Sequence, residues 1–199
     1  ARLRSPAVAT LAMTLGPTLA MTHRLTAVIL AAGTGSRFGG QKLLVEIAGK
    51  AMIARVLAAV AHLPTVVVGP RDLEPRLSPA RLIENDAPER GMAHSLRLAN
   101  AAIGERKAIV VLLADMPFMT RAIVDAVVGG AGNADVCYPQ RAGVGGHPVL
   151  FSAHARTKIA ALRDGDTLRS LRDDPSLTRR TIDVADDGAY RDVDRASDI

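Results

Sequence analysis

The chain has 199 residues, a formal net charge of +5 at pH 7 and 48% apolar residues. This length suits one domain, and the balance of apolar and charged residues argues against extensive disorder. Cys137 is the single cysteine, which excludes an intrachain disulfide and a cysteine-based zinc site and favours a reducing, cytoplasmic location. The basic residues are scattered and aromatic residues are few, so we expect no nucleic-acid partner and instead a polyanionic small molecule.

The first twenty residues differ from the rest of the chain. Arg2 and Arg4 precede an apolar run that superficially resembles a secretory signal, but Gly16 and Pro17 interrupt it, and it is too short to cross a bilayer. We therefore interpret residues 1–20 as a leader or disordered extension, with Met21 as the preferred start. Residues 21–199 are expected to form one domain, and no membrane association is expected.

Strands and helices are expected to alternate along that domain. Apolar runs rich in β-branched residues predict strands at 25–30, 65–68, 81–84, 108–113, 134–138, 148–151 and 181–184. Apolar residues at helical spacing predict helices at 51–62, 91–102, 122–128, 153–162 and 167–172. Parallel strands need crossover connections, so this order predicts an α/β fold: a single Rossmann-like three-layer domain with a mostly parallel sheet. Ligands of such sheets bind at the carboxyl ends of the strands.

A glycine-rich loop, LAAGTGSRFGGQK at 30–42, follows the first strand. Its glycines keep side chains away from an incoming polyphosphate, so backbone amides can face the anion. Arg37 and Lys42 add the cations that a triphosphate needs beyond neutral amides. The loop matches neither the dinucleotide fingerprint GxGxxG nor the P-loop GxxxxGK followed by Ser or Thr. The alternative is a plain glycine-rich turn with two solvated cations.

Extended to LAAGTGSRFGGQKLL, the loop resembles the LAAGxxxRxGxxKLL signature of the molybdopterin-cofactor nucleotidyltransferases, in particular the molybdenum cofactor cytidylyltransferase group. Four more segments follow in that family's order: GMAHSLR at 91–97, ADMPFM at 114–119, GHPVLF at 146–151 and DVDRASDI at 192–199. The GMxxSL segment favours the cytidylyl branch, since the guanylyl branch typically carries a GPLAG-like stretch there. One departure is GDTLR at 165–169, where the family usually has GDxGxR.

The resemblance implies a nucleotide-diphospho-sugar transferase type of fold and transfer of CMP from CTP to the terminal phosphate of molybdopterin, with release of pyrophosphate. It makes Asp115 the magnesium ligand, with Asp194 as a candidate second ligand, and Mg²⁺ suits such carboxylates. Asp115 could instead be a turn residue and Asp194 a solvated charge. The catalytic residues are then Arg37, Lys42 and Asp115, which act by alignment and charge neutralisation because a phosphate monoester is already ionised.

The residues expected to bind the nucleotide are Leu30, Ala31, Ala32, Gly33, Gly35, Ser36, Arg37, Lys42, Asn85, Ser95 and Asp115. Asn85 could bind the base or sugar hydroxyls, or form an Asx turn, and Ser95 could bind the base or ribose. His147 could contact the pterin substrate or order the loop before a proline. Basic residues of the last third, Arg156 among them, could surround an anionic pterin phosphate or form a solvated helix face.

Two other hypotheses remain open. Within enzymes, the chain could be a guanylyl or sugar-phosphate nucleotidyltransferase, in which case GTP replaces CTP or another phosphorylated acceptor replaces molybdopterin. Outside enzymes, it could be a non-catalytic accessory protein that binds a nucleotide or the pterin and shows no turnover. In either molybdopterin interpretation, transient contact with a molybdoenzyme or its chaperone is expected.

Overall fold

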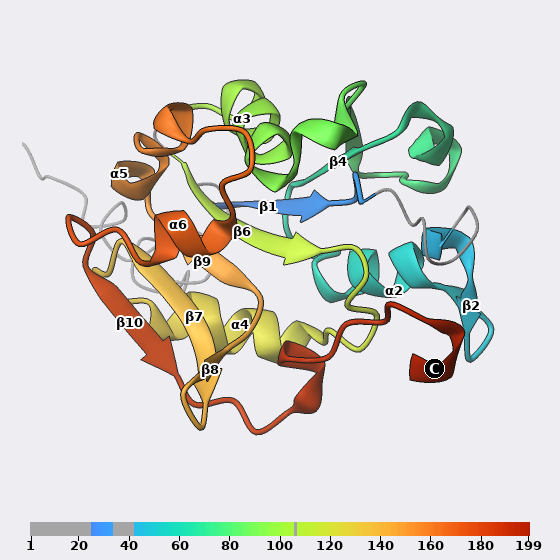
Figure 1. Ribbon diagram of the computed structural model, residues 1–199. Coiled ribbons are helices and arrows are strands. Elements are labelled where there is room, and N and C mark those ends of the chain that lie inside the picture. Colours follow the sequence, from blue (N-terminus) through green and yellow to red (C-terminus); the bar gives the residue numbers. More distant parts are fainter. Residues whose placement is uncertain (1–24, 34–41, 106) are drawn as a thin grey trace, which may run out of the picture.

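The computed structural model describes residues 25–33, 42–105 and 107–199, and these fold around one eight-stranded sheet (Figure 1). Seven strands lie in the order β10-β7-β9-β6-β1-β4-β5, and β8 pairs with β7. The strands of this sheet are β1 (Leu25–Leu30), β4 (Thr65–Gly69), β5 (Arg81–Glu84), β6 (Ala108–Leu113), β7 (Val136–Arg141), β8 (Val144–Gly145), β9 (Val149–Phe151) and β10 (Arg179–Ile182). A separate small hairpin is formed by β2 (Glu46–Ile47) and β3 (Lys50–Ala51).

The sheet is mixed and mostly parallel, which confirms the expected α/β fold class. Strands β5, β4, β1 and β6 run parallel, and so do β7 and β10. The three-residue strand β9 runs antiparallel to both of its neighbours, β6 and β7. The carboxyl ends of β1, β4 and β6 therefore lie at one edge, where side chains that follow these strands can meet.

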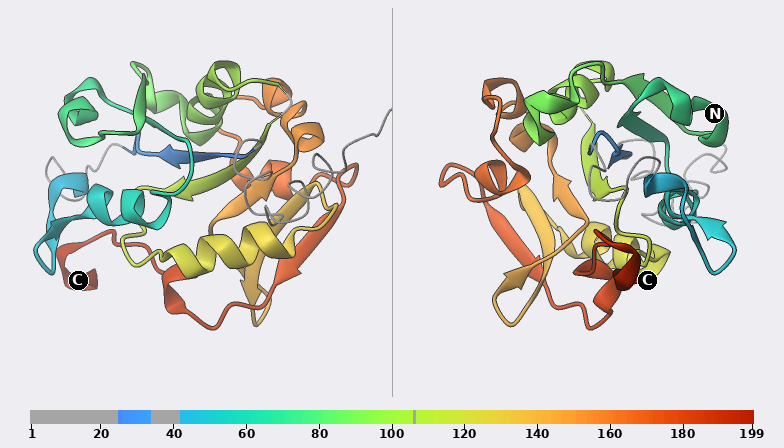
Figure 2. Two further views of the ribbon diagram at one scale, coloured as in Figure 1. Left: turned by 180° about the vertical axis from the view of Figure 1, so that it is seen from behind. Right: turned by 45° about the vertical axis from the view of Figure 1, so that its right-hand side comes forward.

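Helices cover both faces of the sheet, as the buried residues of β1 show. Ala27 and Ile29 pack in one apolar cluster with α2 (Met52–Ala59) and α4 (Arg121–Gly130). Val28 and Leu30 pack in the other cluster with α3 (Met92–Ala102), α5 (Ala153–Arg156) and α6 (Leu168–Arg172). Successive strand side chains point to opposite faces, so a strand buried on both sides reads as one continuous apolar run. Figures 1 and 2 show the resulting three layers.

Several element boundaries differ from the sequence predictions. The helix expected at 153–162 is interrupted: α5 ends at Arg156, and Ile159–Ala161 form a separate 3₁₀ turn. The hydroxyl of Thr157 donates to the carbonyl of His154 at 2.8 Å, which satisfies a helix-end acceptor. The helix expected at 51–62 ends at Ala59. The strands expected at 134–138 and 181–184 are shifted to 136–141 and 179–182.

Gly91, the residue before α3, adopts a conformation that favours glycine. Its φ is +83°, in the left-handed region, and it closes the 3₁₀ turn Pro88–Arg90 before the helix starts at Met92. The helix expected from Gly91 therefore starts one residue later, with Gly91 as its N-cap. In the part of the chain that the structure describes, none of these helices has the length and apolarity needed to cross a membrane.

Candidate active site at the carboxyl ends of β1 and β6

A small cavity of about 50 Å³ lies where β1 and β6 end. It is lined by Leu30, Ala31, Gly33, Lys42, Leu43, Ala114 and Asp115. The amide of Ala31 donates to the carbonyl of Val68 at 2.7 Å, and the amide of Ala114 donates to that of Leu30 at 3.0 Å. These bonds continue the sheet past the ends of its strands. Five residues of the sequence-predicted set therefore line one cavity, while Ala32 lies in the chain between two of them without lining it.

Lys42 lies between two carboxylates that are distant in sequence. Its Nζ is 2.8 Å from Asp194 Oδ1 and 3.3 Å from Asp115 Oδ2. Burial lowers the pKa of Lys42, but the hydrogen bond to Asp194 and the charge of Asp115 outweigh that effect and raise its pKa above the ordinary value. The side chain therefore stays an ammonium at neutral pH. Lys42 is only 12% exposed and is therefore not a solvated cation, whereas Asp194 is 47% exposed, so its role as a metal ligand stays a prediction.

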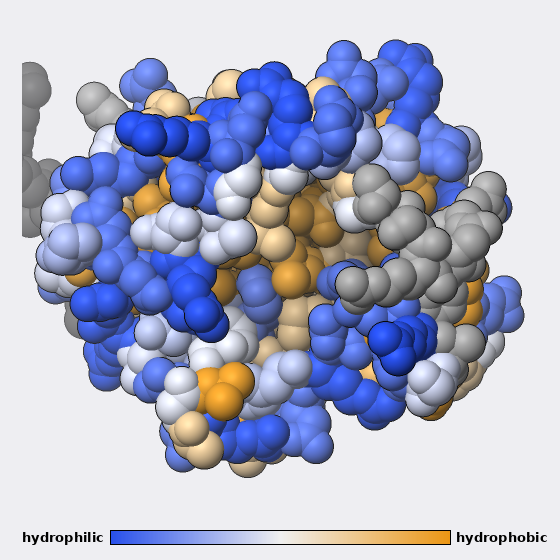
Figure 3. Space-filling model, viewed as in Figure 1, coloured by the Kyte–Doolittle hydropathy of each residue, from blue (hydrophilic) through white to orange (hydrophobic). Residues whose placement is uncertain are grey.

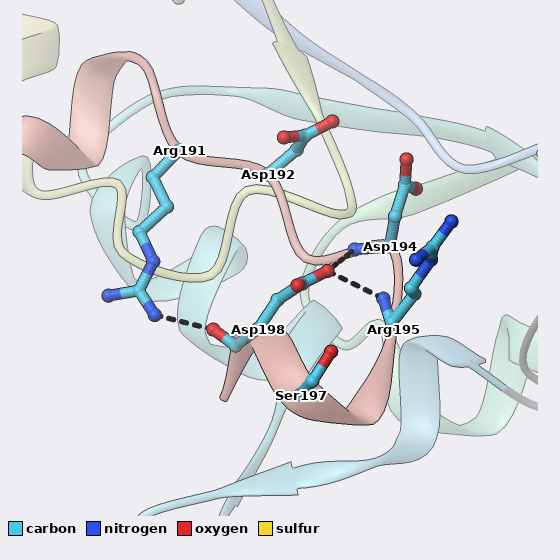
Figure 4. Close-up of a pocket in the computed structure, with 6 residues that line it drawn as sticks. All are labelled: Arg191, Asp192, Asp194, Arg195, Ser197 and Asp198. Atoms are coloured by element: carbon cyan, nitrogen blue, oxygen red, sulfur yellow. Dashed lines mark hydrogen bonds between the residues drawn. The ribbon is translucent and has the colours of Figure 1, made fainter.

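The C-terminal segment is held against the cavity by backbone contacts. The amide of Val193 donates to the carbonyl of Asp115 at 2.9 Å, and the Val193 side chain is buried beside Ile47 and Met52. One carboxylate oxygen of Asp198 accepts from the backbone amides of Asp194 at 2.9 Å and Arg195 at 2.7 Å (Figure 4). These contacts fix the backbone that carries Asp194. The prediction from sequence missed Asp198, although its place in DVDRASDI, four residues after Asp194, is a signal for such a turn.

A wider hollow of about 550 Å³ lies over the same C-terminal segment (Figure 4). It is lined by Arg191, Asp192, Asp194, Arg195, Ser197 and Asp198. The Arg191 guanidinium lies 4.2 Å from the centre of the Phe118 ring, so this segment also packs against the loop that follows Asp115. The two carboxylates that meet at Lys42 thus lie on two segments that contact each other through backbone, apolar and cation–π contacts.

The carboxylates of Asp115 and Asp194 form a donor set that suits a hard divalent cation. Within the described ranges no group of three or more His, Cys, Asp or Glu residues could hold a metal alone. Two carboxylates with phosphate oxygens from a substrate are a common way to hold Mg²⁺, which seldom has a cage made of protein alone. Lys42 Nζ lies between both carboxylates, which shows that a positive charge is accommodated at this position.

Asn85 and Ser95 form a buried polar pair beside β5 and α3. Asn85 Nδ2 donates to Ser95 Oγ at 2.9 Å, and both residues are buried. Asn85 Oδ1 also accepts from the amide of Ala87 at 3.0 Å, so the Asx-turn interpretation holds. The structure brings these two predicted residues to each other. They do not line the small cavity at Lys42, and a role in binding the base or ribose stays a prediction.

His147 lies on a different cavity, between the β8–β9 turn and α6. It precedes a cis peptide bond to Pro148, and its backbone amide donates to the carbonyl of Ala189 at 2.8 Å. Burial is the main cause that lowers the pKa of His147 to about 4, against an upward effect of a hydrogen bond with the Val111 backbone, and the charge of Arg172 makes a smaller downward contribution. The ring is therefore neutral at neutral pH. Its backbone orders the loop, while contact with a pterin stays a prediction.

The structure contradicts both interpretations of Arg156 that the sequence allowed, a solvated side chain and a ligand of the pterin phosphate. Its guanidinium is buried and donates to the carbonyls of Asn100, Ile103, Gly104 and Lys107 and to Asn100 Oδ1, at 2.7 to 3.0 Å. These acceptors lie at and beyond the C-terminal end of α3, where carbonyls lack partners inside the helix. Arg156 is thus neither solvated nor available to a pterin phosphate. Of the remaining candidates, Gly35, Ser36 and Arg37 lie outside the described residues.

Residues 27–181 match the family model of the MobA-like NTP transferase domain, which is more than half of the chain. The chain belongs to this family. Among curated proteins, the bifunctional protein GlmU of Heliobacterium modesticaldum is 32% identical over 114 residues, which is 53% of this chain and 25% of GlmU. The bifunctional enzyme IspD/IspF of Bradyrhizobium sp. strain ORS 278 is 32% identical over 130 residues, or 59% and 33% of the two chains. The chain thus spans about a quarter to a third of these relatives.

Solved structures give the same fold over most of their length. An Rv0371c homologue from Mycobacterium sp. strain JC1 is 26% identical, with a TM-score of 0.71 over 88% of this chain and 92% of that one. Molybdopterin-guanine dinucleotide biosynthesis protein A of Archaeoglobus fulgidus is 19% identical, with a TM-score of 0.66 over 87% and 94%. Rv0371c of Mycobacterium tuberculosis in complex with manganese is 21% identical, with a TM-score of 0.68 over 81% and 88%. The latter two are less than 25% identical and show the fold alone. They confirm the expected fold of the nucleotide-diphospho-sugar transferase type.

Proposed function

We propose that this MobA-like NTP transferase moves CMP from CTP to the terminal phosphate of molybdopterin and releases pyrophosphate. The observation that carries the proposal is the position of Lys42 Nζ between Asp115 and Asp194, next to the residues that line the ends of β1 and β6. Nucleotidyl transfer needs a site that holds cations against a triphosphate and carboxylates against those cations. This arrangement supplies both kinds of charge at the sheet edge where ligands bind.

In this proposal Asp115 and Asp194 hold Mg²⁺. When bound there, the ion would neutralise charge on phosphate oxygens of the nucleotide and help to orient them. Two observations support a divalent ion: the donor set consists of carboxylate oxygens, and a structure with the same fold, that of Rv0371c, is a complex with manganese. Asp194 is held in place by the Asp198 carboxylate and by the backbone contact of Val193 with Asp115.

Lys42 has two roles in this proposal. Without substrate its ammonium neutralises the two carboxylates, and with substrate it donates hydrogen bonds to phosphate oxygens of the triphosphate or of the departing pyrophosphate. Arg37, which lies outside the described residues, is the proposed second cation. The acceptor phosphate is already ionised at neutral pH, so none of these residues has to remove a proton from the nucleophile.

The preference for cytosine is proposed from the segment GMAHSLR. In the structure this segment comprises the left-handed Gly91 and the first turns of α3, with Ser95 bonded to Asn85. Ser95 accepts from the side-chain Nδ2 of Asn85, so its hydroxyl keeps a proton to donate, and in this proposal a base or ribose oxygen accepts that proton at the buried pair. A cytoplasmic location and transient contact with a molybdoenzyme or its chaperone belong to the same proposal.

Pyrophosphate release tests the proposed reaction. The full chain is incubated with Mg²⁺, with CTP or GTP, and with molybdopterin or a sugar 1-phosphate as the acceptor, and pyrophosphate is measured with and without that acceptor. The proposal predicts release that requires CTP, acceptor and metal together. Release with GTP alone among the nucleotides would make the enzyme a guanylyltransferase, and release only with a sugar 1-phosphate would replace the acceptor. CTP binding without any release would make the chain an accessory binder.

Lys42→Met and Lys50→Met provide a matched pair for this assay. Lys50 is an exposed lysine of the β2–β3 hairpin, so its substitution removes the same charge away from the cavity. We expect Lys42→Met to lower the rate by about a hundredfold or more, in line with the loss of one transition-state donor. Lys50→Met should keep the wild-type rate, and an equal loss in both variants would contradict the site.

A further inference from the structure

A small apolar cluster lies beside the candidate active site, apart from the two clusters that cover the main sheet. Its buried members are Ile47 of β2, Met52 at the start of α2 and Val193 of the C-terminal segment. Leu43 and Phe118 pack against these three, and Leu43 also lines the cavity of about 50 Å³. Figure 1 shows α2 and β2 next to the C-terminal end of the chain, and Figure 3 shows a hollow with an apolar floor beside this region. Segments that are far apart in the chain therefore meet at the edge of the site.

Each charged residue of the site is attached to this cluster through a close neighbour in the sequence. Lys42 directly precedes Leu43, and Asp194 directly follows Val193. Asp115 lies three residues before the phenylalanine that packs on the cluster. The distances from Lys42 Nζ to the two carboxylates, 2.8 and 3.3 Å, therefore depend on how these three segments are held relative to one another.

Arg55 of α2 joins two of these segments through their backbone carbonyls. Its Nε donates to the carbonyl of Pro117 at 3.0 Å, and its Nη1 donates to the carbonyl of Ile47 at 3.1 Å. Pro117 lies two residues after Asp115, and Ile47 lies five residues after Lys42. The partly buried guanidinium therefore ties the loop that carries Asp115 to the hairpin that follows Lys42.

The carbonyl of Pro117 lies in the loop between β6 and α4, past the last residue of the strand. A partly buried loop carbonyl needs a donor that the sheet no longer supplies, and a guanidinium has several donors in a fixed plane. The amide of Val193 already fixes the carbonyl of Asp115 at 2.9 Å. With Arg55 bonded to Pro117, the turn at Asp115 is held on both sides, by the C-terminal segment and by α2.

The alternative is that Arg55 only stabilises its own helix. However, α2 packs through its buried residues Met52, Ile53, Val56 and Ala59, without the charged side chain. Both carbonyls that Arg55 binds lie outside the helix, one 8 residues before Arg55 and the other 62 residues after it. The hydrogen bonds of Arg55 therefore stabilise the arrangement of the segments around the site.

We infer that Arg55 is a positioning residue of the proposed transfer reaction, which fixes Asp115 and Lys42 relative to each other through the carbonyls of Pro117 and Ile47. The inference rests on the proposed function, since it assigns Arg55 to the alignment of the metal and the triphosphate. Arg55 itself touches no substrate in this scheme. It acts through the backbone of the residues that do.

Pyrophosphate release per CTP-binding site tests the inference. The full chain is assayed with Mg²⁺, saturating CTP and the acceptor, and calorimetry counts the sites that bind CTP, so a loss of folded protein does not count as a loss of rate. The variants are Arg55→Met, which removes both hydrogen bonds, and Arg55→Lys, which keeps the charge but loses the planar fork. Arg81→Met is the matched control, because the exposed Arg81 also donates to a carbonyl, that of Ala102 at 3.0 Å, and does not line the cavity.

We expect Arg55→Met to lower kcat per site by about tenfold, because misplaced groups lose their alignment in the transition state. The KM for CTP should change by less than about twofold, since Arg55 touches no substrate. Arg55→Lys should lose only about threefold, because an ammonium can still donate to one of the carbonyls. Arg81→Met should keep the wild-type rate.

Hydrogen exchange of the free protein gives a second measurement that needs no substrate. The backbone amides of residues 116–119 and 193–195 should exchange about fivefold faster in Arg55→Met than in the wild type, because the loop at Asp115 opens more often. The amides of β1 should exchange at the wild-type rate in the same sample. A role in global stability alone would instead change the exchange of β1 as well.

An unchanged kcat per site in Arg55→Met, or an equal loss in Arg81→Met, would overturn the inference. If Arg55→Met does not fold, Arg55→Lys decides, and a wild-type rate in that variant would overturn it. Failure of the proposed function gives a different pattern, in which the wild type releases no pyrophosphate from CTP. Hydrogen exchange then still tests the contact, and unchanged exchange at residues 116–119 would show that Arg55 does not position Asp115.

Discussion

Replacing Lys42 with Met should change metal binding and turnover in opposite directions. Lys42 Nζ lies 2.8 and 3.3 Å from carboxylates that, in our proposal, hold the metal, so in the free protein the ammonium competes with the ion. At an effective dielectric of about 20, one unit charge about 4 Å away is worth about 4 kcal/mol. Asp115 and Asp194 are 31% and 47% exposed, so solvent screening reduces this to about 1 kcal/mol.

A change of about 1 kcal/mol corresponds to about fivefold in a dissociation constant. We therefore expect Lys42→Met to bind Mn²⁺ about fivefold more tightly than the wild type in the absence of nucleotide, while pyrophosphate release falls by about a hundredfold. Electron paramagnetic resonance of free Mn²⁺ measures the first quantity, and a coupled pyrophosphate assay measures the second. Lys50→Met, with the same charge change on the exposed hairpin, should match the wild type in both assays.

The opposite sign in the metal titration would refute this reasoning. If Lys42→Met bound Mn²⁺ as weakly as the wild type, or more weakly, the ammonium would not compete with the ion, and Asp115 and Asp194 would not be its ligands. A loss of Mn²⁺ binding together with a lowered thermal midpoint would show that Lys42 mainly holds the two carboxylate segments together.

Substitutions at three further positions test other parts of the structure. Arg156→Met leaves four carbonyls near the end of α3 without their buried donor, so chemical denaturation should show a loss of about 3 kcal/mol or more, and a small change would contradict the role of this clamp. The pKa of His147 is lowered to about 4 in the folded protein, so below about pH 6.5 the unfolded ring takes up a proton that the folded ring does not. The free energy of unfolding should therefore fall by up to about 3 kcal/mol between pH 6.5 and 4. His147→Gln should flatten that part of the pH profile, and a profile as steep as that of the wild type would assign the effect to other groups. Asp198→Ala frees the Asp194 backbone and should raise the Mg²⁺ concentration needed for half-maximal activity by about fivefold. Asp198→Asn keeps an amide oxygen that can accept the same hydrogen bonds, so this variant should need nearly the wild-type Mg²⁺ concentration.

The sheet and the centre of the site could be predicted from the sequence because local patterns determine them. The runs 25–30 and 108–113 form strands with the expected bounds, since buried parallel strands are continuously apolar and β-branched, and the run 81–84 keeps its bounds as a partly exposed edge strand. Asp115 comes two residues after the end of one strand and Lys42 ends the loop after another, so the topology of a parallel sheet brings them to one edge. Their contact joins residues 73 apart in the chain.

What escaped prediction depends on contacts between segments far apart in the chain. The polarity of Arg156 predicts a solvated or ligand-binding side chain, and only the carbonyls beyond α3 explain its burial. The three-residue β9 carries no pattern that distinguishes an antiparallel from a parallel partner. Asp194 meets Lys42 across 152 positions, through a backbone contact of Val193 that no side-chain motif reveals.

The central claim is a triphosphate site built on Lys42 and Asp115. The most direct test is the thermal midpoint with Mg²⁺ and each of CTP, GTP, ATP and UTP, for the wild type, Asp115→Ala and the isosteric Asp115→Asn, because a ligand of the folded state raises that midpoint. We predict a rise with CTP that exceeds the others in the wild type and is reduced in both variants. No rise with any nucleotide, or an equal rise in Asp115→Ala, would contradict the site.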